Sequence, residues 1–301
     1  MPSQQSERAQ PYLSVILPMY NEQAAVGQTV TGVTAVLNKL MAGHFEIIVV
    51  DDGSSDDSAA AVNALALPCV RLIQHPYNIG NGAAVKTGIR QAKGTYILLM
   101  DADGQHRPED IPRLLEHAEL YDMVVGARTN ESDTAVHRDL ANTVYNRLAT
   151  YICGRPIDDL TSGFRLIRAE LAKSLVYLLP NTFSYPSTIT LAVVRGGFSL
   201  KYVPIAARKR VGKSKINLLV DGSRFLTIIL RIAVFFAPLK VFIPVSLFFF
   251  LSGFSWYVYR VFFVGTGFPP ISSLFMTTAV VIFLIGLVSE QITYLRYGKE
   301  N

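Results

Sequence analysis

Hydrophobic and polar positions alternate between two periodicities over the first hundred residues. Short apolar runs rich in branched residues predict buried strands at 13–18, 46–50, 70–74 and 96–100. Helical spacing between these runs predicts helices at 24–41, 59–65 and 81–92. Strands that alternate with helices in this way indicate an α/β fold, with a mostly parallel sheet and helices on both of its faces.

The last part of the chain is much more apolar, with Phe, Val, Ile and Leu dominating after about residue 230. Two stretches without a charge, 241–258 and 271–289, approach the ~20 residues that cross a bilayer. Between them Arg260 is the one charged residue, whereas basic residues precede the first stretch and follow the second. By the positive-inside rule we expect a multi-pass hairpin in the cytoplasmic (inner) membrane with both termini cytoplasmic. The alternative is a pair of buried helices in a soluble core.

The apolar boundary predicts three parts. Residues 1–215 are expected to form a cytosolic α/β domain, and residues 237–301 a two-span transmembrane anchor. Between them, 216–236 places Asp221, Arg224 and Arg231 among apolar residues, which is typical of an amphipathic helix at the membrane interface. The first ten residues are polar and contain no apolar signal core, so we expect the globular part to stay in the cytosol.

The net charge of +5 is modest, but basic residues concentrate in 201–215, just before the apolar segments. This arrangement suits anionic lipid headgroups and phosphate-bearing substrates. The stretch lacks the repeated stacking aromatics of a single-strand binder, which argues against a nucleic-acid partner. Cys69 and Cys153 have no metal-ligand or redox spacing and are expected to be free thiols in a reducing compartment.

Polar clusters follow three of the predicted strands, at 18–22, 51–54 and 101–105. Ligands of open parallel sheets bind beyond the carboxyl ends of the strands, so these clusters should meet in one crevice. Asp101 and Asp103 offer the hard oxygen ligands that Mg²⁺ or Mn²⁺ prefers when it bridges a protein to substrate phosphates. An acidic pair can also be a solvated turn, and 51–54 can be a capped turn. A strand-end carboxylate such as Asp52 can equally accept hydrogen bonds from a base or ribose.

The order and spacing of several motifs resemble glycosyltransferase family 2, most closely its polyprenyl-phosphate branch of dolichyl-phosphate mannose synthase and GtrB-like enzymes. The likeness runs over most of the chain, and no single motif is decisive. The matching segments are 18–22 for P-x-Y-N-E, 51–54 for D-D-G-S, 78–84 for N-x-G-x-G-x-A, 101–105 for D-A-D-x-Q, 126–128 for G-x-R, 161–165 (Thr-Ser-Gly-Phe-Arg) and 212–215 for G-x-S-K.

The resemblance implies a GT-A (Rossmann-like) fold and a set of site residues. The nucleotide-sugar pocket would be formed by Pro18, Tyr20, Glu22, Val50, Asp52, Asp101, Ala102, Arg128, Lys209 and Lys215. The Mg²⁺ or Mn²⁺ and the diphosphate would be held by Asp101, Asp103 and Gln105. The lipid phosphate would meet Arg128, Ser162, Arg165 and Arg210, and the catalytic residues would be Asp103, Arg128 and Asp159. Where relatives place an arginine three residues before Gly212, this chain has Lys209 between Arg208 and Arg210, so the contacting residue stays open.

The activity that the resemblance implies is inverting, metal-dependent transfer of a hexose from GDP-mannose or a UDP-sugar to an undecaprenyl or dolichyl phosphate. The attacking phosphate oxygen is already ionised, so positioning and electrostatics should dominate over base catalysis. Asp158 and Asp159 are candidates for orienting the acceptor or taking up a residual proton, with Asp159 favoured and an ordinary loop carboxylate as the alternative. Membrane relatives often self-associate, so a homo-oligomer is compatible with this assignment.

Other functions fit the sequence less well. A processive polysaccharide synthase should carry a Q-x-x-R-W motif, but the sole tryptophan, Trp256, lies inside an apolar stretch, and two spans do not enclose a pore. A non-catalytic membrane scaffold of the same fold should have lost some of the acidic residues, Gln105 or Arg128. A dinucleotide fingerprint at 80–82 lacks its third glycine. No histidine is assigned a role, although His106 follows the acidic motif directly.

Overall fold

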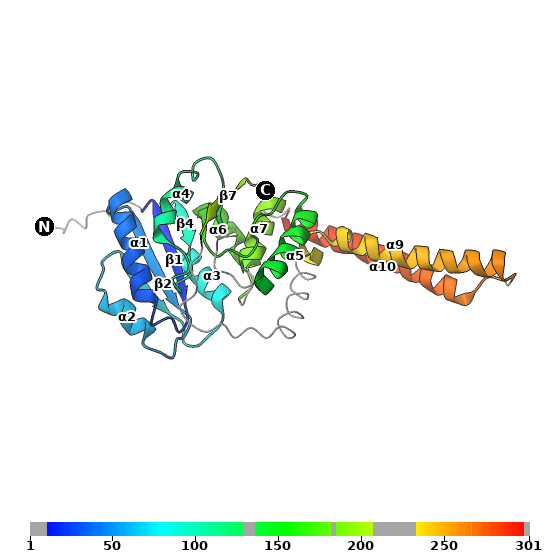
Figure 1. Cartoon of the computed structure of the whole chain (residues 1–301), viewed down its shortest axis with the longest axis horizontal. Coiled ribbons are helices and arrows are strands. Elements are labelled where there is room, and N and C mark those ends of the chain that lie inside the picture. The colour runs from blue at the N-terminus through cyan, green and yellow to red at the C-terminus, as the bar shows by residue number, and fades with distance from the viewer. Residues whose placement is uncertain (1–10, 129–135, 182–184, 207–232, 266, 298–301) are drawn as a thin grey trace. The chain divides into compact units, whose positions relative to one another are not determined.

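The computed structural model of the chain describes residues 11–128, 136–181, 185–206, 233–265 and 267–297 (Figure 1). Its backbone divides into two compact units. The first unit is Met1–Arg147 with Pro156–Lys215, and the second is Leu148–Arg155 with Ile216–Asn301. The predicted interfacial helix at 216–236 lies almost wholly outside the described ranges, as do Lys209, Arg210 and Lys215 of the basic segment.

The first unit is built on a seven-stranded sheet in the order β3-β2-β1-β4-β6-β5-β7. Its strands are β1 (Leu13–Met19), β2 (Phe45–Asp51), β3 (Val70–Gln74), β4 (Tyr96–Leu99), β5 (Met123–Arg128), β6 (Arg165–Arg168) and β7 (Leu200–Ile205). Strand β6 runs antiparallel to both β4 and β5, and the other pairings are parallel. The predicted mostly parallel α/β sheet is therefore confirmed, with one inverted strand that the pattern did not reveal.

Helices cover both faces of this sheet. The helices before the hairpin are α1 (Val26–Met41), α2 (Ser58–Ala64), α3 (Asn81–Gln91), α4 (Ile111–Leu115), α5 (Val136–Cys153), α6 (Ala169–Leu175) and α7 (Tyr185–Arg195), with short 3-10 turns η1 (Pro108–Asp110) and η2 (Val176–Leu178). Helix α5 begins in the first unit and ends in the second. In Figure 1 helix α1 lies on one side of β1 and β2, and α3 lies on the other.

Strand β1 shows why both faces must be covered. All of its residues are buried, and successive side chains of a strand point to opposite faces. Val15 shares a hydrophobic cluster with Val30 of α1, whereas Ile16 lies against Gly88 of α3, where an added Cβ would approach its Cγ2 to within 2.3 Å. A strand buried on both sides reads as a continuous apolar run, which is the pattern found at 13–18.

The second unit contains a helical hairpin. Helix α9 (Pro238–Val258) continues into a π-helical turn, η3 (Tyr259–Phe263), and α10 (Pro270–Tyr297) returns. Both helices are long and apolar enough to span a membrane, which fits the two predicted stretches. They pack closely where side chains are small: a Cβ added at Gly253 would lie 2.8 Å from the Cβ of Phe275, and one at Gly286 would lie 2.7 Å from that of Phe242.

The start of α9 is held by a polar contact inside the second unit. The Nζ of Lys240 donates hydrogen bonds to the carbonyl oxygens of Tyr151 (2.6 Å) and Ile152 (2.9 Å) in the last turn of α5. These carbonyls belong to the negative end of the helix dipole, where a cation is stabilising. Lys240 therefore joins the end of α5 to the hairpin.

Candidate functional site

The loops that follow β1 and β2 are hydrogen-bonded to each other. Asn21 adopts a left-handed backbone (φ 54°), its N–H donates to Ser54 Oγ (2.9 Å), and its Oδ1 accepts from the N–H of Ser55 (2.8 Å). The N–H of Glu22 donates to Ser58 Oγ at 2.9 Å. The two segments that contain Tyr20 and Asp52 therefore form one connected rim at the carboxyl edge of the sheet.

Three of the predicted nucleotide-pocket residues have distinct places on this rim. Pro18 of β1 and Val50 of β2 are buried partners in the parallel ladder, so they form the floor behind the loops. Tyr20 is 46% exposed and is free to present its ring to a ligand. An exposed aromatic ring over a buried strand end is a suitable stacking surface for a nucleobase.

Asp52 points inward, to the turn that precedes α3. Its Oδ1 accepts hydrogen bonds from the N–H of Ile79 (3.1 Å) and from Nδ1 of His75 (2.8 Å), and its Oδ2 accepts from the N–H of Gly80 (2.7 Å). The residue is only 2% exposed. Its carboxylate therefore holds the turn at 78–80 against the rim, a structural task that the sequence did not indicate beside its predicted contact with the base or ribose.

His75 is a residue that the sequence reasoning did not identify. Its second ring nitrogen, Nε2, lies 2.9 Å from Thr87 Oγ1 on α3. The two ring nitrogens of His75 thus link the Asp52 carboxylate to a hydroxyl of α3. No motif marked this link, because Asp52 and His75 are 23 residues apart in the chain.

The acidic motif follows β4, and its second carboxylate, that of Asp103, belongs to a residue only 8% exposed. Ala102 is buried, and its carbonyl accepts a hydrogen bond from Thr29 Oγ1 of α1 at 3.3 Å. The side chain of Asp101 is 32% exposed. Asp103 Oδ1 accepts from the N–H of Gln105 at 3.1 Å, across a turn that needs the left-handed backbone of Gly104 (φ 74°).

The donor set of this turn fits a hard divalent cation. Asp101, Asp103 and Gln105 offer oxygen atoms within five consecutive residues. Over the described ranges, no group of three or more His, Cys, Asp or Glu side chains forms a metal cage. Mg²⁺ and Mn²⁺ sites of this kind complete their coordination with substrate phosphates and water, so a partial protein shell is what a diphosphate-bridging ion requires.

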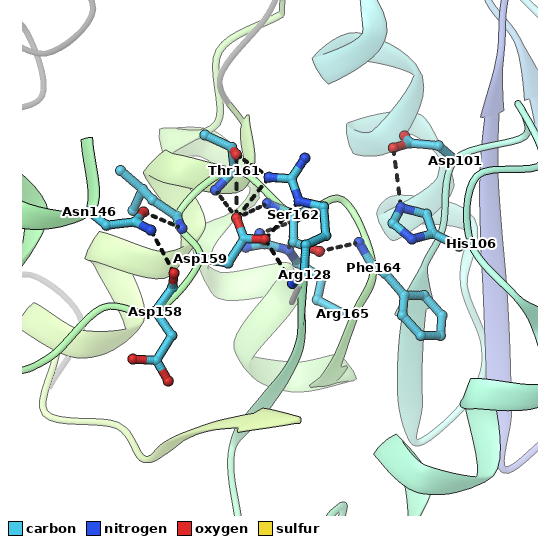
Figure 2. A network of polar contacts seen from close by, with 11 residues as sticks. Asp101, His106, Arg128, Asn146, Asp158, Asp159, Thr161, Ser162, Phe164 and Arg165 are labelled. Carbon is cyan, nitrogen blue, oxygen red and sulfur yellow. Dashed lines mark hydrogen bonds and ion pairs between the residues drawn. The ribbon is translucent and has the colours of Figure 1, made fainter. Parts of the chain in front are cut away.

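The carboxylate of Asp101 lies next to a segment far away in the sequence. A Cβ added at Gly163 would approach its Oδ2 to within 2.5 Å, so the absence of a side chain at Gly163 leaves room for this carboxylate. The Nε2 of His106 is 3.7 Å from the same oxygen, and the His106 ring stacks on Phe164 with 5.2 Å between ring centroids (Figure 2). The acidic motif and the Thr-Ser-Gly-Phe-Arg segment thus lie side by side.

Arg128, at the end of β5, forms a two-point ion pair with Asp159 (Figure 2). Its Nε and Nη2 donate to Oδ2 (2.8 Å) and Oδ1 (2.9 Å), and Nη2 also contacts Thr161 Oγ1 at 2.5 Å. Burial alone would raise the pKa of Asp159, but the hydrogen bonds and charge of Arg128 outweigh it and hold that pKa below its usual range. Asp159 is therefore ionised at neutral pH and positions Arg128.

Two predicted lipid-phosphate contacts lie deeper than expected. Arg165 is fully buried; it donates through Nη1 to the carbonyl of Pro186 (2.8 Å) and to Thr190 Oγ1 (3.0 Å), and it also binds the carbonyl of Ser162. Ser162 is buried as well, and its hydroxyl accepts from the N–H of Phe164. In this structure both residues support the segment from beneath instead of facing a ligand.

The mostly parallel sheet, with an acidic turn after β4 and an arginine at the end of β5, has the architecture of the GT-A fold. The chain belongs to glycosyl transferase family 2, whose family model matches residues 14–176, more than half of the chain. Residues 237–295 match the model of the GtrB C-terminal hairpin, which confirms the resemblance to the polyprenyl-phosphate branch.

Several curated relatives carry one name, undecaprenyl-phosphate 4-deoxy-4-formamido-L-arabinose transferase. The protein from Serratia proteamaculans (strain 568) is 32% identical over 189 residues, which are 58% of this chain and 57% of the relative. The protein from Enterobacter sp. (strain 638) is 31% identical over 225 residues, which are 69% of this chain and 65% of the relative. The chain thus spans less than two thirds of the length of these relatives.

Solved structures with the same fold include glucosyl-3-phosphoglycerate synthase from Mycobacterium tuberculosis. Its complex with Mn²⁺, UDP-glucose and phosphoglyceric acid is 19% identical, with a TM-score of 0.59 and coverage of 75% of this chain and 80% of that one. Its complex with UDP gives a TM-score of 0.58 at the same identity. At this identity the likeness establishes the fold, and the predicted GT-A architecture is confirmed.

Proposed function

We propose that this chain transfers a sugar from a nucleotide diphosphate to a polyprenyl phosphate, with inversion at the anomeric carbon. One structural observation carries the proposal: the segment 159–163 contacts both Arg128 and Asp101, through Asp159 on one side and Gly163 on the other. The arginine and the predicted metal ligand Asp101 therefore border the same five-residue segment. The names of the curated relatives, which are transferases acting on undecaprenyl phosphate, support the acceptor class.

The residues of the chain divide the work of this reaction between them. Asp101, Asp103 and Gln105 would hold Mg²⁺ or Mn²⁺, and such an ion supplies positive charge to the leaving diphosphate. Arg128 presents a fixed guanidinium to the phosphates, which stabilises charge that develops in the transition state without reorganisation. Because Asp159 is ionised and paired with Arg128, its role is to position that arginine, and the acceptor phosphate needs no proton removed.

The identity of the sugar donor is part of this proposal. The structural neighbour holds UDP-glucose with Mn²⁺, and the curated relatives are named for a formamido-arabinose, so a UDP-sugar is the donor we place first and GDP-mannose second. Tyr20 on the rim would stack on the base, above the floor made by Pro18 and Val50. The transfer assay described below identifies which sugar is transferred.

The membrane topology is likewise part of the proposal. Helices α9 and α10 would cross the inner membrane, with the α/β domain and both termini on the cytoplasmic side, where nucleotide sugars are found. Anchoring of this kind confines enzyme and lipid acceptor to one plane. Self-association through the anchor is compatible with this arrangement.

The test is transfer by the purified full chain in detergent, with Mn²⁺, undecaprenyl phosphate and a panel of UDP-glucose, UDP-4-deoxy-4-formamido-L-arabinose and GDP-mannose. We expect one donor to give a polyprenyl-phosphate sugar, and Asp103→Ala to abolish it. Asp57→Ala removes an exposed carboxylate before α2 and serves as the control. Full transfer by Asp103→Ala would exclude the metal role, and no transfer from any of several further nucleotide sugars would overturn the proposed activity.

A further inference from the structure

The imidazole of His106 has an unusual environment for a polar ring. The residue is only 6% exposed, and its ring lies nearly parallel to Phe164, at an interplanar angle of 19°. Its Nδ1 is buried and has no hydrogen-bond partner in the described part of the chain. Phenylalanine would stack on Phe164 equally well and would bury no unpaired nitrogen. Packing alone therefore does not explain a histidine at this position.

The other nitrogen provides the explanation. Nε2 of His106 lies 3.7 Å from Oδ2 of Asp101, which is longer than a hydrogen bond but within the range of a direct electrostatic contact (Figure 2). Gly163 borders the same oxygen, because an added Cβ would stand 2.5 Å from it. Oδ2 thus lies between the His106 ring and the backbone of Gly163, while the Asp101 side chain keeps 32% of its surface exposed.

The remaining groups around Asp101 do not supply such a contact. The hydroxyl of Tyr185 is buried and makes no hydrogen bond within the described residues, although burial and then the charge of Asp101 raise its pKa. The guanidinium of Arg165 is occupied by Ser162, Pro186 and Thr190. His106 is therefore the side chain best placed to orient the Asp101 carboxylate.

We propose that His106 is a positioning residue that orients Asp101 for the divalent cation. The proposal rests on the metal-dependent function proposed above and deepens it. Residues that bind metal ligands from the second layer typically change metal affinity ten- to a hundredfold when removed. They do so without touching the ion, because a free carboxylate must be ordered before it can bind. The unpaired Nδ1 then lowers stability, and the histidine is kept because its Nε2 contacts Asp101.

The effect of His106 on metal binding and its effect on stability can be measured on the same variants. His106→Phe keeps the ring stack, removes the unpaired nitrogen and removes the contact with Asp101. His106→Gln keeps a polar group that can reach Asp101. His117→Phe, on a histidine that meets Tyr121 edge-on at 6.2 Å, makes the same chemical change away from the acidic motif and serves as the control.

The experiment is titration of the full-length protein in detergent with Mn²⁺ at saturating UDP, followed by the electron paramagnetic resonance signal of free Mn²⁺, alongside thermal unfolding without metal. We expect His106→Phe to unfold at the same or a higher temperature than the parent and to bind Mn²⁺ about tenfold more weakly. His106→Gln should bind within about threefold of the parent, and His117→Phe should bind as the parent does.

Two results would overturn the role proposed for His106 while leaving the proposed function of the protein intact. One is parental Mn²⁺ affinity in His106→Phe, and the other is a joint loss of stability and affinity, which would mean a packing role. Gly163→Ala provides a second route to the same carboxylate, and Mn²⁺ affinity equal to that of the parent in a folded Gly163→Ala would count against the idea that Oδ2 is held in place. Absence of Mn²⁺ binding by the parent would instead overturn the metal site itself, and this inference with it.

Discussion

The guanidinium of Arg128 and the carboxylate of Asp159 meet at two points, with Nε 2.8 Å from Oδ2 and Nη2 2.9 Å from Oδ1. The same carboxylate accepts from the N–H groups of Thr161 and Ser162, both at 3.0 Å. One side chain thus joins the end of β5 to the segment before β6. Paired N–H donors on a carboxylate are among the stronger and more directional contacts in proteins.

Arg128→Lys should separate charge from geometry at this site. A lysine ammonium keeps the charge but cannot reproduce the planar fork, so we expect transfer to fall about a hundredfold, as it does when a fixed transition-state donor is lost. Steady-state transfer to undecaprenyl phosphate measures it. Arg113→Lys changes an exposed arginine that pairs with Asp110 at 2.8 Å and should leave the rate unchanged. Equal transfer rates in the two variants would mean that the guanidinium of Arg128 has no role in the reaction.

The stability of the protein should depend on pH through Asp159. Because its folded-state pKa is lowered, the Arg128–Asp159 pair stabilises the fold fully above the unfolded value of about 3.9 and loses this contribution as pH falls through the folded pKa. Asp159→Asn lacks the stabilisation by this ion pair at every pH. We expect its unfolding temperature to lie well below that of the parent at pH 6, and the gap to narrow towards pH 3.

Asp158→Asn provides the comparison for this pH series, because Asp158 is exposed and adjacent in sequence. Its unfolding temperature should follow that of the parent throughout. A gap between the parent and Asp159→Asn that stays constant from pH 6 to pH 3 would contradict the lowered pKa.

Two glycines with the same backbone conformation should respond differently to alanine. Gly43 (φ 79°) has no atom within 4 Å of an added Cβ, so Gly43→Ala should cost about 1 kcal/mol for the left-handed backbone alone. Gly53 (φ 73°) would place its Cβ 2.5 Å from the carbonyl carbon of Tyr77, so Gly53→Ala should cost several times as much, about 3 kcal/mol or more. Chemical unfolding measures both free energies.

The consequence for ligand binding distinguishes the two glycines further. Gly53 lies in the rim that carries Asp52, so Gly53→Ala should also weaken UDP binding, whereas Gly43→Ala should not. Isothermal titration of the folded variants measures this, and unchanged UDP affinity in Gly53→Ala would place the nucleotide elsewhere.

Arg165→Met tests whether this arginine supports the site or binds the lipid phosphate. Methionine removes the donors that satisfy the carbonyl of Pro186 and the hydroxyl of Thr190 in a fully buried place, so we expect a loss of about 3 kcal/mol in the free energy of unfolding. The KM for undecaprenyl phosphate, measured below both unfolding transitions, should stay as in the parent. A raised KM with unchanged stability would instead support the direct contact between Arg165 and the lipid phosphate that the family resemblance implies.

Local pattern was sufficient for much of the architecture. The strand predicted at 70–74 coincides with β3, and the other predicted strands and helices lie within about two residues of those observed, because burial on both faces leaves continuous apolar runs. The two predicted apolar stretches lie within the two long helices, because a helix that crosses a bilayer needs about 20 apolar residues and such a run is visible in the sequence. The acidic motif and the family were equally readable, because oxygen ligands at a strand end lie within a few consecutive residues.

What local pattern does not contain is the choice of partner. Asp52 and Asp159 were both recognised as site residues, yet their actual partners lie 23 to 31 residues away in sequence, at His75, Gly80 and Arg128. The inverted direction of β6 brings the 159–165 segment back to the acidic motif, and strand pairing of this kind depends on contacts distant in sequence. Periodicity indicates which face of a helix or strand is buried. The roles of His106, Arg165 and Asp52 depend instead on the residues that surround their side chains, and these residues come together only in the folded protein.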